Sequence, residues 1–78
     1  MVYCNLEKVD GNKVLYSIGG YSDDITGKLL IDFKTQEYIL LEEPKNSKVY
    51  DYFIKRLLSK HQSNFEKGIF KQRISYEI

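Results

Sequence analysis

Apolar and polar residues alternate in KLLIDFK, residues 28–34, and this pattern sets the strongest limit on the fold. Leu29, Ile31 and Phe33 fall on one side of an extended chain, and charged side chains alternate with them. A repeat of two residues is typical of a strand with one buried face. Because one such strand is not stable in isolation, the rest of the chain must supply further strands and a layer that covers the apolar face.

Three more segments in the first half of the chain have strand character. Residues 2–9 and 13–18 are rich in β-branched, aromatic and aliphatic types, and DGN at 10–12 separates them. Gly, Asp and Asn tolerate a positive φ, so these two segments are predicted to form a hairpin. Residues 37–43 are expected to form a fourth strand, which Pro44 ends because proline has no N–H to donate.

The residues after Pro44 change to a helical repeat. A helix is predicted over about 48–63, with Asn46 or Ser47 as its N-cap, because either side chain can accept from free amides of the first turn. The apolar face of this helix contains Val49, Tyr50, Phe53, Ile54 and Leu57, with Leu58 at its edge, and the opposite face contains Lys48, Asp51, Lys55 and Ser59.

A final strand is predicted over 69–78, after SNFEKG at 63–68 ends the helix and Gly68 forms the exit turn. Its alternation sets Phe70, Ile74, Tyr76 and Ile78 on one side. The predicted fold class is therefore α+β, with two layers, a mostly antiparallel sheet in the order β-β-β-β-α-β, and one amphipathic helix packed on one face. The order of the strands within the sheet does not follow from the sequence.

Composition limits the class of protein further. The 78 residues suffice for a single small domain, and the only cysteine, Cys4, excludes an internal disulfide. The sequence has neither an apolar run of the length that crosses a membrane nor a signal peptide, so we expect a cytoplasmic protein without a membrane role. Ten lysines against two arginines favour an AT-rich coding sequence, such as that of a low-GC bacterium or its phage.

The loop SIGGYSDDITGK, residues 17–28, resembles neither of two common ligand loops. The six residues between Gly20 and Gly27, and Leu29 after Lys28, do not match a phosphate-binding P-loop. If Gly27 is placed at the sixth position of a calcium-binding EF-hand loop, Phe33 falls at the twelfth, where a carboxylate is required.

Two adjacent carboxylates in this loop, Asp23 and Asp24, remain as candidate functional residues. They can bind a divalent ion loosely, or they can accept hydrogen bonds from nearby backbone amides, which is the commoner role of aspartate in loops.

No catalytic site is indicated. His61, the only histidine, is expected in the last turn of the helix, where it caps free carbonyls or is solvated. Cys4 is expected on the inner face as a small core residue, and nothing in the sequence links it to His61 as a dyad. The expectation is a non-catalytic accessory or regulatory binding protein that needs no cofactor and no metal.

Two surfaces are candidates for binding. Tyr3, Leu15, Leu30 and either Ile39 or Leu41 fall on the side of the sheet away from the predicted core. A protein partner or a second copy of the chain would cover such a face, and isolated surface apolar residues are the alternative.

The second candidate surface is basic, and it makes nucleic-acid binding the alternative function. Residues 1–43 hold four lysines and eight acidic residues, whereas residues 44–78 hold eight basic and three acidic residues. This asymmetry indicates either an anion-binding surface or two halves that attract each other. The candidate contacts, interleaved with tyrosines, are Lys48, Lys55, Arg56, Lys60, Lys71 and Arg73.

Overall fold

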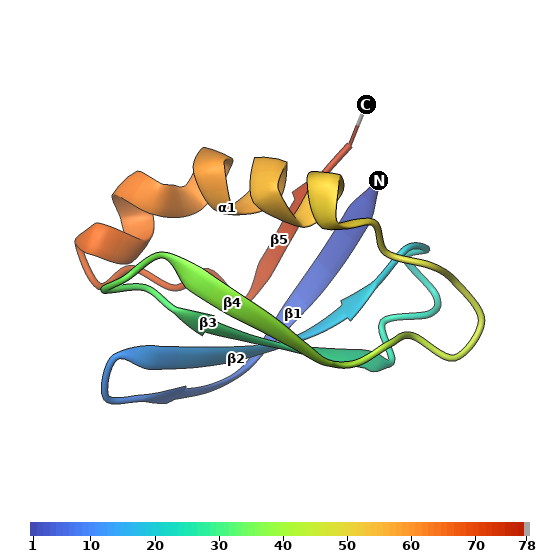
Figure 1. The fold of residues 1–78 in the computed structure, drawn as a ribbon, viewed down its shortest axis with the longest axis horizontal. Helices are drawn as coiled ribbons and strands as arrows, with labels where there is room; N and C mark the ends of the chain where they lie inside the picture. The colour runs from blue at the N-terminus through green and yellow to red at the C-terminus, as the bar shows by residue number, and fades with distance from the viewer. Residues whose placement is uncertain (78) are drawn as a thin grey trace.

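A computed structural model describes residues 1–77 and shows one antiparallel sheet with one helix packed on it (Figure 1). The elements are β1 (Val2–Asp10), β2 (Lys13–Gly19), β3 (Gly27–Asp32), β4 (Glu37–Glu42), α1 (Asp51–Glu66) and β5 (Arg73–Tyr76). The strand order is β4-β3-β2-β1-β5, and every neighbouring pair is antiparallel. The predicted α+β class and element order are confirmed.

Short turns connect β1 to β2 and β3 to β4, whereas a longer loop, residues 20–26, connects β2 to β3. Gly11 takes a φ of +60° between β1 and β2, which agrees with the predicted hairpin turn. Between β3 and β4, Gln36 has a φ of +64°, and the Asp32 carboxylate accepts from the backbone N–H of Lys34 at 3.0 Å and of Thr35 at 3.2 Å. After α1 the chain returns to the far side of β1, where Val2 pairs with Tyr76 and Cys4 with Ile74.

The core lies between α1 and one face of the sheet. It consists of Val2, Cys4, Val14, Tyr16, Ile18, Leu29, Ile31 and Ile74 from the sheet, Ile54, Leu57 and Phe65 from α1, and Val49 from the segment before it. Tyr16 is fully buried in the middle strand, and its hydroxyl donates to the carbonyl of Lys71 at 3.1 Å. The inward orientation predicted for Leu29 and Ile31, and the core position predicted for Cys4, are confirmed.

The helix begins and ends three residues later than predicted. Tyr50 precedes it with an extended backbone (φ −90°, ψ 141°) and makes no side-chain cap hydrogen bond. The predicted caps Asn46 and Ser47 are therefore wrong, and Tyr50 is 54% exposed rather than on the buried face. At the other end, buried Phe65 extends the apolar face beyond residue 63, and Gly68 forms the exit turn with a φ of +74°.

The last strand is shorter than predicted. It covers Arg73–Tyr76 rather than 69–78, and Ile78 lies outside the described residues. Phe70 precedes the strand and packs against the core through its ring, with centroids 5.0 Å from Phe33 and 5.6 Å from Phe65. This aromatic contact and the hydrogen bond from the Leu6 N–H to the Gln72 carbonyl at 2.7 Å hold the segment between α1 and β5.

Candidate functional site

The loop between β2 and β3 is held against the segment that precedes α1 by the side chain of Asp24. One carboxylate oxygen accepts from the Thr26 hydroxyl at 3.0 Å, and the other accepts from the Ser47 hydroxyl at 2.7 Å and the Asn46 N–H at 2.9 Å. The Ser47 hydroxyl in turn accepts from the Gly20 N–H at 2.9 Å. Ser47 therefore joins two segments of the chain instead of capping the helix.

Close backbone contacts and a lowered pKa follow from this arrangement. A Cβ at Gly19 would lie 2.0 Å from the Asp24 carbonyl oxygen, so no side chain fits there. The hydrogen bond from Ser47, followed by those from Asn46 and Thr26, lowers the pKa of Asp24 against the opposing effect of burial. Asp23 is exposed, whereas Asp24 is only 4% exposed. The adjacent carboxylates thus separate, and that of Asp24 holds the loop in place.

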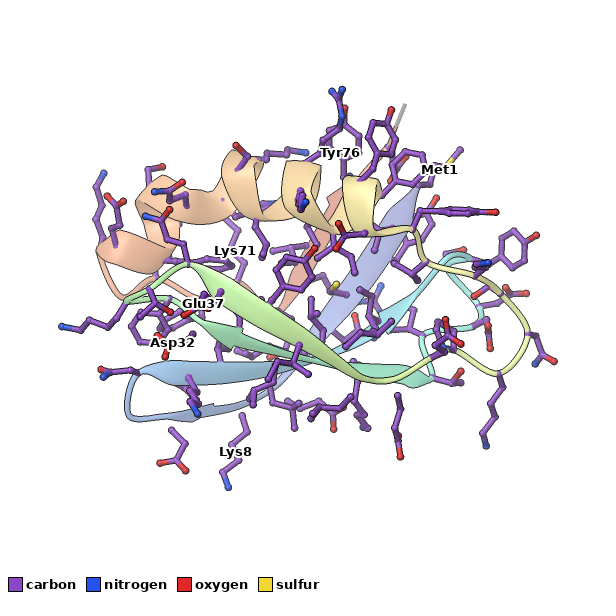
Figure 2. All side chains as sticks on the ribbon, in the orientation of Figure 1. Met1, Lys8, Asp32, Glu37, Lys71 and Tyr76 are labelled. Atoms are coloured by element: carbon purple, nitrogen blue, oxygen red, sulfur yellow. The ribbon has the colours of Figure 1, made fainter. Side chains whose placement is uncertain are left out.

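The outer face, which we define as the face of the sheet turned away from α1, carries an apolar row across three strands. The register sets Leu15 of β2 beside Leu30 of β3, and Leu30 beside Ile39 of β4. Lys8 of β1 continues the row next to Leu15, and Figure 2 shows it projecting on the side opposite α1. Ile39 is 60% exposed, and Leu15 and Leu30 are partly exposed.

The other two residues predicted for this face are not in the row. Leu41 lies at a register shift of β4 between the Leu29–Leu40 and Lys28–Glu42 pairs and is 52% exposed. Tyr3 of β1 pairs with Gly19, the last residue of β2, and with Ser75 of β5, so it lies away from the row. The three predicted residues that the structure brings together are thus Leu15, Leu30 and Ile39.

Charged residues border the apolar row. On one side the register aligns Lys13, Asp32 and Glu37, and on the other it aligns Lys28 with Glu42. Lys28 also forms an ion pair with Glu7, and Lys55 forms one with Asp51 at 3.1 Å. Neither of these ion pairs, the two found among residues 1–77, joins the acidic half of the chain to the basic half.

Some of the predicted basic residues gather around exposed tyrosine rings near the start of α1. The Arg56 guanidinium lies 4.7 Å from the ring centroid of Tyr52 and donates to the Tyr76 hydroxyl at 3.4 Å. The Lys48 ammonium lies 5.4 Å from the ring centroid of Tyr50, and Lys60 donates to the Ser75 carbonyl at 3.2 Å. Tyr50 and Tyr52 are each exposed by more than half.

The remaining basic residues point elsewhere. Lys55 is engaged by Asp51. Arg73 pairs with Asn5 and, by alternation with buried Ile74, lies on the outer face. Lys71 is exposed beyond the far end of α1, where its charge acts on His61. The six basic residues therefore do not form one patch.

His61 is in the body of α1 and faces the core, so the predicted place in the last turn is wrong. It is 8% exposed, its Nε2 has no hydrogen-bond partner, and its ring centroid lies 6.4 Å from that of Phe65. Burial, followed by the charges of Lys60 and Lys71, lowers the pKa of His61, while a hydrogen bond to the Ser75 backbone opposes the shift. Burial also raises the pKa of the Cys4 thiol to about 12, so the thiol stays protonated at neutral pH.

The structure also contains a groove that the sequence did not predict. It lies between α1 and the β3–β4 hairpin, has a volume of about 260 Å³, and is lined mainly by Ile31, Phe33, Tyr38, Leu58 and Phe65. Tyr38 and Leu40 are two residues apart in β4, and both turn toward the core face. Two sequence features could have indicated the groove: the alternation of residues 37–43, and the position of Leu58 at the edge of the apolar helical face.

No protein-family model, curated protein or solved structure matches the chain. No three His, Cys, Asp or Glu side chains within residues 1–77 are grouped so that they could hold a metal ion. Over the same residues, no helix has the length and apolar character needed to span a membrane.

Proposed function

We propose that this chain is a non-catalytic interaction protein that associates with a second copy of itself through the outer face. The observation that carries the proposal is the row Leu15–Leu30–Ile39, which no element of the described chain covers. Apolar side chains that adjoin on an open sheet face favour association, because a partner removes them from water. The burial of Cys4 and His61 supports binding rather than catalysis.

The charges around the row fit a two-fold arrangement. A two-fold axis parallel to the strands, between β2 and β3, sets Leu15 of one protomer over Leu30 of its partner. The same axis sets Lys13 over the partner's Asp32 and brings Lys8 near the partner's Glu37 and Glu42. Opposite charges around an apolar centre give a pairing register as well as attraction.

Light scattering coupled to gel filtration tests this proposal over protein concentrations from micromolar to millimolar. The natural chain should show the mass of a dimer, and Ile39→Lys should show that of a monomer. Ile69→Lys is the matched control, because Ile69 is 48% exposed and lies outside the sheet. A monomer mass for the natural chain throughout, or equal masses for both variants, would refute the proposal.

A substitution at Asp10 tests the orientation of the two copies. Asp10 pairs with Lys13 at the end of the hairpin, so the two-fold axis sets it over the partner's Glu37. Because the two-fold axis repeats this contact, Asp10→Asn removes two like-charge contacts per dimer and should strengthen the dimer, most clearly at low salt. An unchanged dissociation constant would contradict this orientation.

Nucleic-acid binding is the second candidate function, and the pairing of Arg56 with the exposed ring of Tyr52 favours it. Aromatic faces beside cations bind single strands through stacking and phosphate contacts. Fluorescence anisotropy with a short oligothymidine should then show binding that weakens steeply between 50 and 200 mM salt. Arg56→Glu with Lys60→Glu should remove this binding, and Lys34→Glu with Lys45→Glu is the control of equal charge. Absence of binding at 50 mM salt would exclude this function.

For either function we propose a cytoplasmic site of action, because the buried thiol of Cys4 needs no oxidising compartment.

A further inference from the structure

The free edge of β4 exposes backbone hydrogen-bonding groups. β4 is the last strand on its side of the sheet, and no element of residues 1–77 lies beyond it (Figure 1). The Phe33 N–H donates to the Asn12 carbonyl. Because hydrogen-bonded pairs alternate along an antiparallel ladder, the odd-numbered residues of β3 direct their backbone N–H and C=O groups toward β2, and the even-numbered residues direct theirs toward β4. Ile39 and Glu37, the partners of Leu30 and Asp32, therefore turn their backbone groups inward. Tyr38 and Leu40 turn theirs outward, to the open edge.

The groove lies on the core side of the same edge. Ile31 and Phe65 at the groove are almost fully buried, whereas Phe33, Tyr38 and Leu58 are partly exposed. Its volume of about 260 Å³ is below the roughly 300–1,000 Å³ of sites for small organic ligands. It is large enough for one or two apolar side chains, which favours a side chain of a partner polypeptide over a free small molecule.

The open edge of β4 and the groove can bind the same peptide. In a strand added to β4, every second side chain would point to the face on which Tyr38 and Leu40 lie, and therefore into the groove. Backbone hydrogen bonds to the edge then give affinity, and the groove gives specificity for the apolar side chains.

The acidic residues on and next to β4 favour a partner with basic residues. Glu37 begins the strand, Glu42 ends it, and Glu43 follows it. Lys55, which also lines the groove, is ion-paired with Asp51. A second copy paired antiparallel through its own β4 would set Glu37 against the Glu42 of its partner at both ends of the new pair, and opposed like charges destabilise such pairs. The edge therefore suits a partner with basic residues around an apolar centre.

We propose that β4 and the groove beside α1 form a binding site for an extended, basic-flanked peptide with alternating apolar side chains, which adds to the sheet as a sixth strand. The apolar groups of this site are separate from the outer face, since Ile39 points away from the groove and the backbone groups at the edge take no part in packing of the outer face. Glu37 and Glu42 border both surfaces, so the two kinds of binding are distinguished by the amides that shift: Phe33 and Tyr38 for the peptide, and Leu15 for self-association.

The probe is a synthetic peptide, acetyl-KKVTVTLKK-amide, titrated into the uniformly ¹⁵N-labelled chain while amide chemical shifts are recorded. The shifts should concentrate at Tyr38, Leu40 and the groove residues Phe33 and Leu58. Three control peptides define the mode of binding. The acidic sequence acetyl-EEVTVTLEE-amide should bind at least tenfold more weakly. Two further peptides are methylated on the backbone nitrogens of alternate residues, one at the odd-numbered and the other at the even-numbered positions. The peptide whose methyl groups replace the N–H hydrogens that would bond to β4 should lose binding.

Charge reversal in the protein provides a matched pair of variants. Glu37→Lys with Glu43→Lys should weaken the basic peptide about tenfold and strengthen the acidic one, because exposed charges at the rim of the site attract or repel the charged ends of the peptide. Asp23→Lys with Glu77→Lys makes the same change in net charge away from β4 and the groove and should leave both affinities unchanged. Each variant is exposed at the substituted positions, and the amide spectrum verifies that it folds.

Several results would overturn the proposal. They are an absence of shifts at millimolar peptide with the natural chain, shifts that map away from β4, equal binding of both methylated peptides, or an equal response of the two charge variants. Broadening of β4 amides that grows with protein concentration in the absence of peptide would instead assign the edge to pairing between two copies.

Discussion

Replacing His61 by phenylalanine should stabilise the protein, although the substitution is made in the core. The ring of His61 is 8% exposed, and its Nε2 has no partner. A buried polar atom without a hydrogen bond costs about 1–3 kcal/mol. Phenylalanine has no such atom, and it would lie beside Phe65, whose ring centroid is 6.4 Å from that of His61.

The gain is reduced by the hydrogen bond that His61 makes to the Ser75 backbone. A bond of this kind contributes about 1 kcal/mol. Its loss leaves no unpaired carbonyl, because Lys60 also donates to the Ser75 carbonyl at 3.2 Å. We therefore expect His61→Phe to raise the free energy of unfolding by about 1 kcal/mol at pH 7.5, which corresponds to a rise in Tm of roughly 4–8 °C for a domain of this size.

The pH dependence of stability should change as well. The pKa of His61 is lowered in the folded protein, so the unfolded chain, with a histidine pKa near 6.5, binds the proton more tightly. The natural protein should therefore lose stability as the pH falls below about 6.5, down to the pKa of the folded state. The phenylalanine variant should lose less, so the difference between the two proteins should be larger at pH 5 than at pH 7.5.

Urea unfolding followed by circular dichroism at pH 5.0, 6.0 and 7.5 measures both effects. His61 is the only histidine, so no other side chain with an ordinary pKa titrates in this interval. A variant that is less stable by more than about 1 kcal/mol would show that the imidazole is better satisfied than its surroundings indicate. Equal pH profiles for the two proteins would show that His61 does not titrate differently in the folded state.

Four further substitutions and one chemical reaction test other parts of the structure. Asp24→Asn should lower the free energy of unfolding at pH 7. Since the pKa of Asp24 is lowered in the folded state, the natural protein loses stability as the pH falls below about 4, and the variant should lose less. Urea melts at pH 7 and pH 3 measure both effects. Leu57→Ala should cost about 2–5 kcal/mol at a fully buried site and leave much of the chain unfolded by circular dichroism. Gly19→Ala should displace the β2–β3 loop, whereas Gly11→Ala, with no atom within 4 Å of its Cβ, should cost only about 1 kcal/mol in thermal melts. Cys4 should react with a thiol reagent at pH 8 only when the protein unfolds, because its pKa is raised to about 12.

The parts of the fold that local sequence determines were predictable. Alternation in 28–34 identified the inward face of β3, and DGN at 10–12 identified the first hairpin, because a strand face and a tight turn depend on a few neighbouring residues. The end of α1 was misplaced because SNFEKG is mostly polar, whereas Phe65 within it packs in the core and continues the helix.

The candidate sites were predictable only in part. Ser47 is a good N-cap residue by type, but its hydroxyl bonds Asp24, which is 23 positions earlier, and no local pattern reports that contact. The apolar row of the outer face combines Leu15, Leu30 and Ile39 because of the pairing register. Arg56 contacts Tyr76 of β5, but Arg73 of the same strand is separated from it because alternation with buried Ile74 turns Arg73 to the outer face. Strand order and register are properties of the whole fold, and a surface that depends on them needs the structure.

The pairing of the first strand with the last makes this sheet suited to circular permutation. Val2 and Tyr76 are partners, so the start of β1 and the end of β5 lie side by side at the same end of the molecule (Figure 1). A linker of a few residues can join residue 77 to Met1, and new ends can be opened at Gly11 in the exposed β1–β2 turn. In the rearranged chain β5 and β1 would become a hairpin, so the one pairing that now requires nearly the whole chain to be in place would form between sequence neighbours.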